Sequence, residues 1–139
     1  MADARYLVDT SVLGRAHQRQ VGDRLEELAR NGAMWTCGMI DLEVVYGSRA
    51  RDVGSTVEER AALPVAPIDQ GVMDRAITVA GLLAGSDRHR GAKPVDLVIA
   101  AAAEAAGLTV LHYDSDYDRI AMVTHQPIEW AAPPGSLDR

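Results

Sequence analysis

Five carboxylates stand beside apolar runs, and their number and setting could support chemistry. Asp9, Glu43 and Asp96 each interrupt an apolar stretch, and Asp114 and Asp116 follow another. An ionised carboxylate among core residues is costly unless it is paired or binds a cation. No lysine or arginine adjoins the first three acids as an obvious partner. Hard oxygen ligands in this number suit Mg²⁺ or Mn²⁺, so the sequence predicts a divalent metal site.

The chemistry of such a site is phosphodiester hydrolysis. A divalent ion polarises the phosphate, lowers the pKa of a bound water and stabilises the leaving oxygen. A structural zinc site is not expected, because Cys37 is the single cysteine and the four histidines show no ligand spacing. His112 lies near the acids but is expected to pack at a strand end rather than to act as a base.

Each acid also has a plainer interpretation. Asp9 could only cap a helix, Asp96 could only complement a helix dipole, and Glu43 could be a solvated helix residue. Asp114 and Asp116 could be turn formers. It is the occurrence of all of them in one chain that favours the metal site.

The elements that would position these acids alternate along the chain. Strands are expected over residues 5–8, 33–37, 64–68, 108–112 and 127–130. Helices are expected over residues 12–19, 22–29, 38–50, 57–63, 70–84 and 96–106, with a short helix after an acidic turn at 113–118 and a polar break at 52–56. Such alternation predicts an α/β fold with a central parallel sheet flanked by helices. Ligands then bind at the carboxyl edge of the sheet, where most of these acids fall.

Composition is typical of one globular domain. Hydrophobic residues make up 47% of the 139, enough for a core built without phenylalanine. We expect a domain over 1–132 and a loose tail over 133–139. No apolar stretch is long enough to cross a membrane, and the first residues lack a signal pattern. With the lone Cys37 expected to be buried, these features favour a cytoplasmic protein.

The net charge of −6 argues against a nucleic-acid partner when taken alone, because phosphate contacts usually need a basic surface. A carboxylate cluster that holds divalent cations changes that argument. It adds negative charge to the count, yet becomes an electropositive centre once loaded.

Four segments in order resemble the PIN-domain family, most closely the VapC-type toxins of VapBC toxin–antitoxin pairs. Residues 7–13 resemble the opening strand with the first metal acid, and residues 41–47 resemble the second acid with its trailing glycine. Residues 94–101 are similar to the third acid and its alanine-rich helix, and residues 111–121 to the closing segment. Tyr117 stands where phenylalanine is more common, which keeps a ring in place.

The resemblance implies a function. It implies a Mg²⁺-dependent endoribonuclease, with Mn²⁺ as a possible substitute, that acts as the toxin of a type II pair and hydrolyses RNA by metal-activated water. Asp9, Glu43, Asp96 and Asp114 carry over as the catalytic, metal-binding acids, and Asp116 can share or replace the last place. It further implies a homodimer and a VapB-like antitoxin that covers the site. Whether one or two ions bind stays open, as does the RNA target.

Supporting residues are less specific. Ser11 matches a hydroxyl often found near the metal, although it could equally cap a helix. Candidate RNA contacts are Arg15, Arg90 and Lys93, with Arg19, Arg49, Arg51, Arg88 and His89 beside them in sequence, and each group could instead be a solvated surface. Apolar residues on the early helices could form a groove for an antitoxin helix, or could be plain core (Leu25, Leu28, Val44 and Val45).

Two other functions fit a similar sheet. One is an acidic-pocket phosphotransfer domain, which Asp9 after the first strand permits. Ser11 and Thr10 stand where a phosphatase or a receiver domain would carry further acids. The other is a catalytically silent PIN-like interaction module, against which the retention of all four acids speaks.

Overall fold

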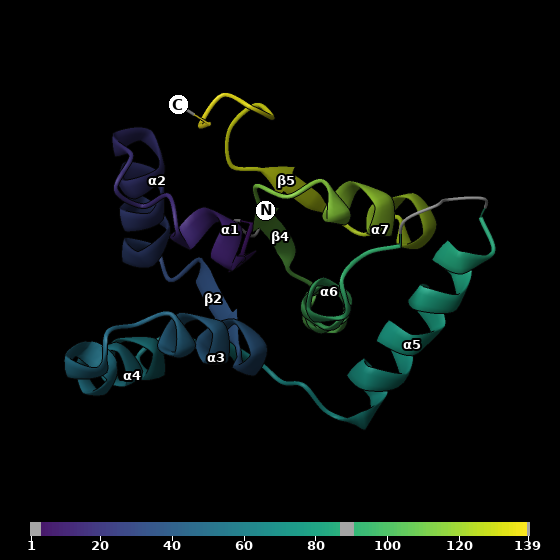
Figure 1. Cartoon of the computed structure of the whole chain (residues 1–139), viewed down its shortest axis with the longest axis horizontal. Coiled ribbons are helices and arrows are strands. Elements are labelled where there is room, and N and C mark those ends of the chain that lie inside the picture. Colours follow the sequence, from purple (N-terminus) through teal and green to yellow (C-terminus); the bar gives the residue numbers. More distant parts are fainter. Residues whose placement is uncertain (1–3, 87–90, 139) are drawn as a thin grey trace.

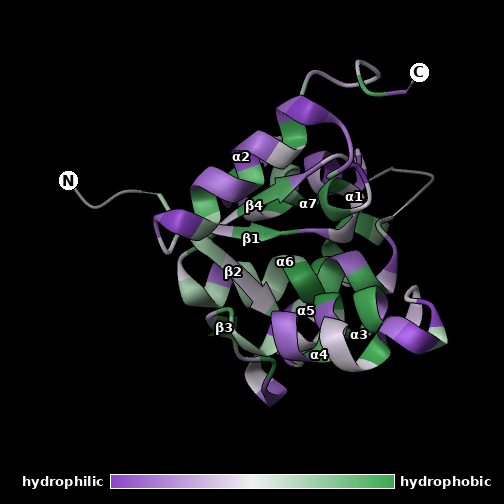
Figure 2. Cartoon of the chain, turned by 90° about the vertical axis from the view of Figure 1, so that its left-hand side faces the viewer, coloured by the Kyte–Doolittle hydropathy of each residue, from purple (hydrophilic) through white to green (hydrophobic). Residues whose placement is uncertain are grey.

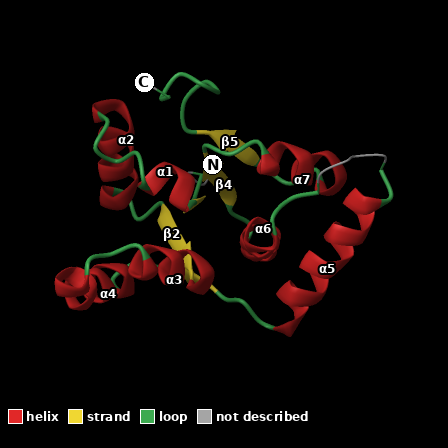
Figure 3. Ribbon diagram, in the orientation of Figure 1, coloured by secondary structure: helices red, strands yellow, loops and turns green. Residues whose placement is uncertain are grey.

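The computed structural model describes residues 4–86 and 91–138 and shows a five-stranded parallel sheet at the centre (Figures 1 and 3). The strand order is β3-β2-β1-β4-β5. In the register of the sheet, Leu7 is paired with Trp35 on one side and with Val110 on the other. The expected α/β fold with a parallel sheet is confirmed. The strands are β1 (Tyr6–Val8), β2 (Met34–Cys37), β3 (Val65–Ala66), β4 (Thr109–His112) and β5 (Ile128–Trp130).

Helices cover both faces of this sheet (Figure 1). One face carries the two early helices, α1 (Thr10–Leu13) and α2 (Arg19–Arg30), and the other carries most of the later ones. The remaining elements are α3 (Gly38–Tyr46), η1 (Ala50–Asp52), α4 (Val53–Ala61), α5 (Gln70–Ala84), α6 (Pro94–Ala106) and α7 (Asp116–Thr124).

Two apolar cores result, one on each side of the sheet. Successive side chains of a strand point to opposite faces, so Leu7 packs with α5 and α6 while Val8 packs with α2. Both residues are fully buried, as expected for a central parallel strand covered on both sides. Figure 2 shows this pattern: β1 is coloured hydrophobic, while α2 alternates between hydrophobic and hydrophilic turns. Leu25 and Leu28 belong to the core on the α2 side of the sheet, called the second core below. They are therefore core residues and do not line a groove for a partner.

Helix ends follow the capping signals where those signals are strong. Asp69 caps α5 by accepting a hydrogen bond from the Val72 amide, and Pro94 occupies the first turn of α6. Gly107 ends α6 in the left-handed conformation at φ 70°, which glycine adopts without a steric penalty.

Three helix boundaries were predicted wrongly. The helix expected over 12–19 is only α1, because Asp9 caps it early and Gly14, a poor helix former, ends it. The helix expected over 38–50 ends at Tyr46, before Gly47. The polar stretch 52–56, expected to be a break, is instead helical, since α4 begins at Val53.

The end of the chain is anchored rather than loose. Leu137 is 4% exposed and packs in the core beside α2, and its amide donates to the Tyr113 hydroxyl at 3.0 Å. Within the tail that was expected to be loose, Leu137 is therefore anchored while residues 133–136 are exposed, and the domain boundary at 132 stays a prediction. Within the described ranges, no helix is long and apolar enough to cross a membrane.

Candidate active site

The site forms where the carboxyl ends of β1 and β4 meet. These strands are neighbours, with Val8 paired to Leu111, so the residues that follow them emerge side by side. Asp9 follows β1, the connection from β4 to α7 carries Asp114, and Asp116 is the first residue of α7. The first turn of α6 brings Asp96 to the same edge. The sequence placed most of the acids at this edge, and the structure confirms that they converge.

Three aspartates form the centre of the cluster. Asp96, Asp114 and Asp116 each offer a carboxylate oxygen, and these oxygens lie within 4.8 Å of one another. Asp96 and Asp116 are buried, and Asp114 is partly exposed. Both Asp114 and Asp116 belong to this cluster, and which of them would be the fourth metal ligand stays a prediction.

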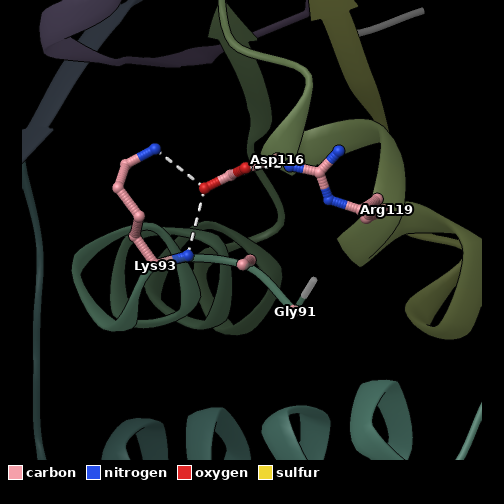
Figure 4. Close-up of a pocket in the computed structure, with 5 residues that line it drawn as sticks. Gly91, Lys93, Asp116 and Arg119 are labelled. Atoms are coloured by element: carbon pink, nitrogen blue, oxygen red, sulfur yellow. Dashed lines mark hydrogen bonds and ion pairs between the residues drawn. The ribbon is translucent and has the colours of Figure 1, made fainter. Parts of the chain in front are cut away.

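The Lys93 ammonium lies among these three carboxylates. Its Nζ is 3.0 Å from Asp96 Oδ2, 2.9 Å from Asp114 Oδ2 and 2.8 Å from Asp116 Oδ2. The Lys93 amide also donates to Asp116, and Arg119 pairs with the other oxygen of the same carboxylate (Figure 4). The expectation that Asp96 has no cationic partner nearby in sequence is wrong, because a lysine one helical turn earlier reaches the same face.

Asp9 is held by two donors. Its Oδ2 accepts from the Ser11 amide at 3.0 Å, which is the helix cap, and its Oδ1 accepts from the Tyr117 hydroxyl at 2.8 Å. Tyr117 is completely buried, and its hydroxyl lies 3.4 Å from Asp96 Oδ1. Capping and membership of the acidic site are therefore compatible roles for Asp9. The Tyr117 hydroxyl was missed in the sequence, where only the ring was considered.

Glu43 lies at the border of the site. It is half-buried on α3, and its Oε1 accepts from the Thr10 hydroxyl at 3.3 Å. Burial and the charge of Asp9 raise the pKa of Glu43. The carboxylate thus lies within electrostatic range of Asp9, although it is outside the cluster of three aspartates.

The surroundings of Asp96 and Asp116 shift the pKa values of these two acids in opposite directions. Burial raises the pKa of Asp96 to about 7, and the neighbouring Asp116 and Asp9 act in the same direction. Burial also acts to raise the pKa of Asp116, but the ammonium and amide of Lys93 outweigh it and lower that pKa below its ordinary range. Like charges this close to one another repel. The acids of such a site are therefore expected to share a proton or to bind a cation.

The donor set suits a hard divalent cation. Among the described residues the cluster contains only carboxylate oxygens, which Mg²⁺ and Mn²⁺ prefer. Asp96 Oδ2 is buried and makes no hydrogen bond of good geometry, so its only close partner is the Lys93 ammonium. The ammonium therefore occupies the place beside this buried oxygen that a metal cation could take.

The other sequence candidates have different contacts. Ser11 Oγ accepts from the Tyr113 amide at 2.8 Å and so ties α1 to the connection after β4. Arg15 stacks over the Tyr113 ring at 4.3 Å and lies 3.7 Å from Asp138. His112 is buried against the Tyr117 and Trp130 rings, which confirms that it packs at the strand end. The candidates Arg88, His89 and Arg90 lie outside the described residues.

Comparison with known proteins identifies the family. The PIN domain model matches residues 6–123. The chain belongs to the PIN domain family. It is 41% identical over 134 residues to Ribonuclease VapC21 of Mycobacterium tuberculosis, covering 95% of this chain and 97% of that protein. It is also 40% identical over 139 residues to Ribonuclease VapC51 of the same species, covering 96% and 98%.

The fold is shared with a solved toxin–antitoxin complex. The crystal structure of DNA-bound VapBC from Salmonella typhimurium superposes with a TM-score of 0.74 at 20% identity, covering 94% of this chain and all of that one. At that identity the likeness supports the PIN fold alone, whereas the two relatives at about 40% connect this PIN domain to the VapC proteins.

Proposed function

We propose that this PIN domain is a Mg²⁺- or Mn²⁺-dependent endoribonuclease, the toxin of a type II toxin–antitoxin pair. The observation that carries the proposal is the cluster of Asp96, Asp114 and Asp116 with Asp9 joined to it through Tyr117. Relatives at about 40% identity over nearly the whole chain are named ribonucleases, which supports RNA as the substrate.

The chain's own residues have separate tasks in this scheme. Asp9, Asp96, Asp114 and Asp116 would hold the ion. Glu43, which the sequence placed among the metal ligands, would add negative charge beside Asp9. A bound Mg²⁺ or Mn²⁺ supplies a Lewis acid for the phosphate and lowers the pKa of a water molecule. Tyr117 and Ser11 orient Asp9 through hydrogen bonds. Lys93, whose side chain is 61% exposed, can turn from the acids to a phosphate of the RNA.

The proposed partners are a VapB-like antitoxin and a second copy of the chain. VapBC complexes among the structural neighbours support the first. Exposed apolar side chains on α3 and α4, namely Leu42, Tyr46 and Val57, offer a surface that an amphipathic helix could cover. The sequence had placed such a groove on residues of α2 and α3, and this surface keeps the α3 part of it.

The proposal is tested by RNA cleavage with an Asp96→Asn variant. Purified protein free of antitoxin is incubated with cellular RNA in Mg²⁺, Mn²⁺ or EDTA. We expect discrete cuts that need metal and that Asp96→Asn slows by about 100-fold or more, the scale of losing a group that stabilises transition-state charge. Asp74→Asn, the same change at an exposed position on α5, should cut normally.

Three outcomes would contradict the proposal. Cleavage that persists in EDTA would argue against metal dependence, and equal cleavage by Asp96→Asn would argue against the acidic site. If folded protein binds Mn²⁺ but never cuts RNA, the silent interaction module becomes the better interpretation.

A further inference from the structure

The hydroxyl of Tyr117 lies between two carboxylates that come from different elements. It donates to Asp9 Oδ1 at 2.8 Å and lies 3.4 Å from Asp96 Oδ1. Asp9 follows β1, Asp96 lies in the first turn of α6, and Tyr117 lies in the first turn of α7. The buried Tyr117 hydroxyl therefore links α7 to α6 and to the end of β1, at the acidic edge of the sheet.

These contacts assign each carboxylate oxygen a direction. Asp9 has both oxygens held, one by the Ser11 amide and one by Tyr117. Asp96 has Oδ1 against the phenol, which leaves Oδ2 directed at the Lys93 ammonium. A carboxylate oxygen has two lone pairs, so one hydrogen bond to each still leaves a lone pair for a cation.

We propose that Tyr117 is a positioning residue, which holds Asp9 and Asp96 as a preoriented pair of metal ligands. This inference rests on the proposed metal-dependent function and goes beyond it by naming a residue outside the ligand set. Hydrogen-bonding partners behind metal ligands typically contribute 10–100-fold to metal affinity.

A purely structural role would need the ring alone. The ring packs in the apolar core and stands 5.0 Å from the His112 ring. Tyr117→Phe retains that packing and removes only the hydroxyl. Tyr113→Phe is the matched control, because it removes the same atom four residues earlier, where the hydroxyl accepts from the Leu137 amide and does not touch the acids.

The test is a titration of the whole chain with Mn²⁺ in the absence of RNA. Electron paramagnetic resonance measures the free Mn²⁺ at each step and so gives the affinity. We expect Tyr117→Phe to weaken Mn²⁺ binding by about tenfold or more and Tyr113→Phe to change it by less than about twofold. Equal affinity of Tyr117→Phe and the unaltered chain would overturn the inference and leave the proposed function standing. Absence of Mn²⁺ binding by the unaltered chain would overturn both.

A second measurement decides the matter if Tyr117→Phe does not fold. Mg²⁺ is titrated into the unaltered chain and into Tyr113→Phe while the tyrosine absorption is recorded. An ion on Asp9 withdraws charge from the oxygen that Tyr117 donates to, so a tyrosine difference band should appear in both proteins. Mg²⁺ binding without such a band would overturn the inference.

Discussion

Lys93 would be expected from its type to point into solvent, but its ammonium lies in the acidic cluster. It is the only lysine in the chain, and its ammonium contacts three carboxylates that a metal ion would also need. Burial acts to lower the pKa of Lys93, but the three carboxylates raise it well above the ordinary value, so the group stays charged. A cation in this position stabilises the acids when no metal is bound, and we expect it to compete with a metal ion for the same oxygens.

Replacing Lys93 should therefore tighten metal binding. We expect Lys93→Gln to lower the Kd for Mn²⁺ by roughly tenfold, which corresponds to relief of only about 1.4 kcal/mol of repulsion. The measurement is a Mn²⁺ titration carried out at several pH values above 7, because loss of the ammonium raises the pKa of Asp96 further than the value of about 7 that it has beside Lys93. Arg75→Gln, which removes a cation paired with Glu104 instead of with the acidic cluster, is the control. Weaker Mn²⁺ binding by Lys93→Gln would show that the ammonium supports the site and does not compete.

At the scale of elements, a buried polar network fixes α4 against β2 and α3. Arg60 donates to Asp41 Oδ1 at 2.9 Å and to the Thr36 hydroxyl at 2.8 Å, and Thr36 donates to the same Asp41 oxygen. Arg60 is buried although it is charged. Because α3 also carries Glu43, this network sets the position of one wall of the site.

Breaking that network should cost more than breaking an exposed ion pair. We expect Arg60→Leu to reduce the free energy of unfolding by about 3 kcal/mol, because Asp41 and Thr36 lose a largely buried partner. Arg75→Leu, which removes a partly exposed pair with Glu104, should cost less than about 1 kcal/mol. Urea unfolding in EDTA measures both values without a contribution from metal. Equal losses would mean that the Arg60 network adds nothing beyond a surface contact.

At the scale of the molecule, the C-terminal segment closes over the second core. Leu137 packs there, its amide reaches Tyr113, and its carbonyl accepts from the Gln18 side chain at 3.1 Å. Tyr113 in turn stacks edge-on against Trp130 of β5. The end of the chain is thus connected to the start of α2 and to the segment that carries the site.

The contribution of this segment can be measured by one substitution. We expect Leu137→Ala to lower the free energy of unfolding by about 2 kcal/mol, at the low end for a buried leucine because the chain end can adjust. Asp138→Ala, which removes an exposed charge 3.7 Å from Arg15, should be nearly neutral. Thermal unfolding of both variants provides the comparison. No loss on Leu137→Ala would restore the loose tail that the sequence suggested.

The sequence alone determined the parallel α/β class, the limits of α5, the end of α6, and the acids that meet at one edge. These features are encoded locally. Apolar periodicity marks strands and helices, Asp69 and Pro94 mark helix starts, and Gly107 marks a helix end. A parallel sheet brings the ends of neighbouring strands together, so Asp9 and Asp114 could be placed at one edge without coordinates. Their roles as metal ligands stay predictions.

Only the tertiary structure decided which groups touch these acids. Tyr117 meets Asp9 across 108 positions of sequence, and Leu137 meets Tyr113 because the chain end folds back. Lys93 lies near Asp96 in sequence, but its approach to Asp114 and Asp116 depends on how α6 packs beside the β4–α7 connection. Contacts of this kind arise from the packing of distant segments. Local composition and periodicity do not specify them, because they describe only a residue's neighbours along the chain.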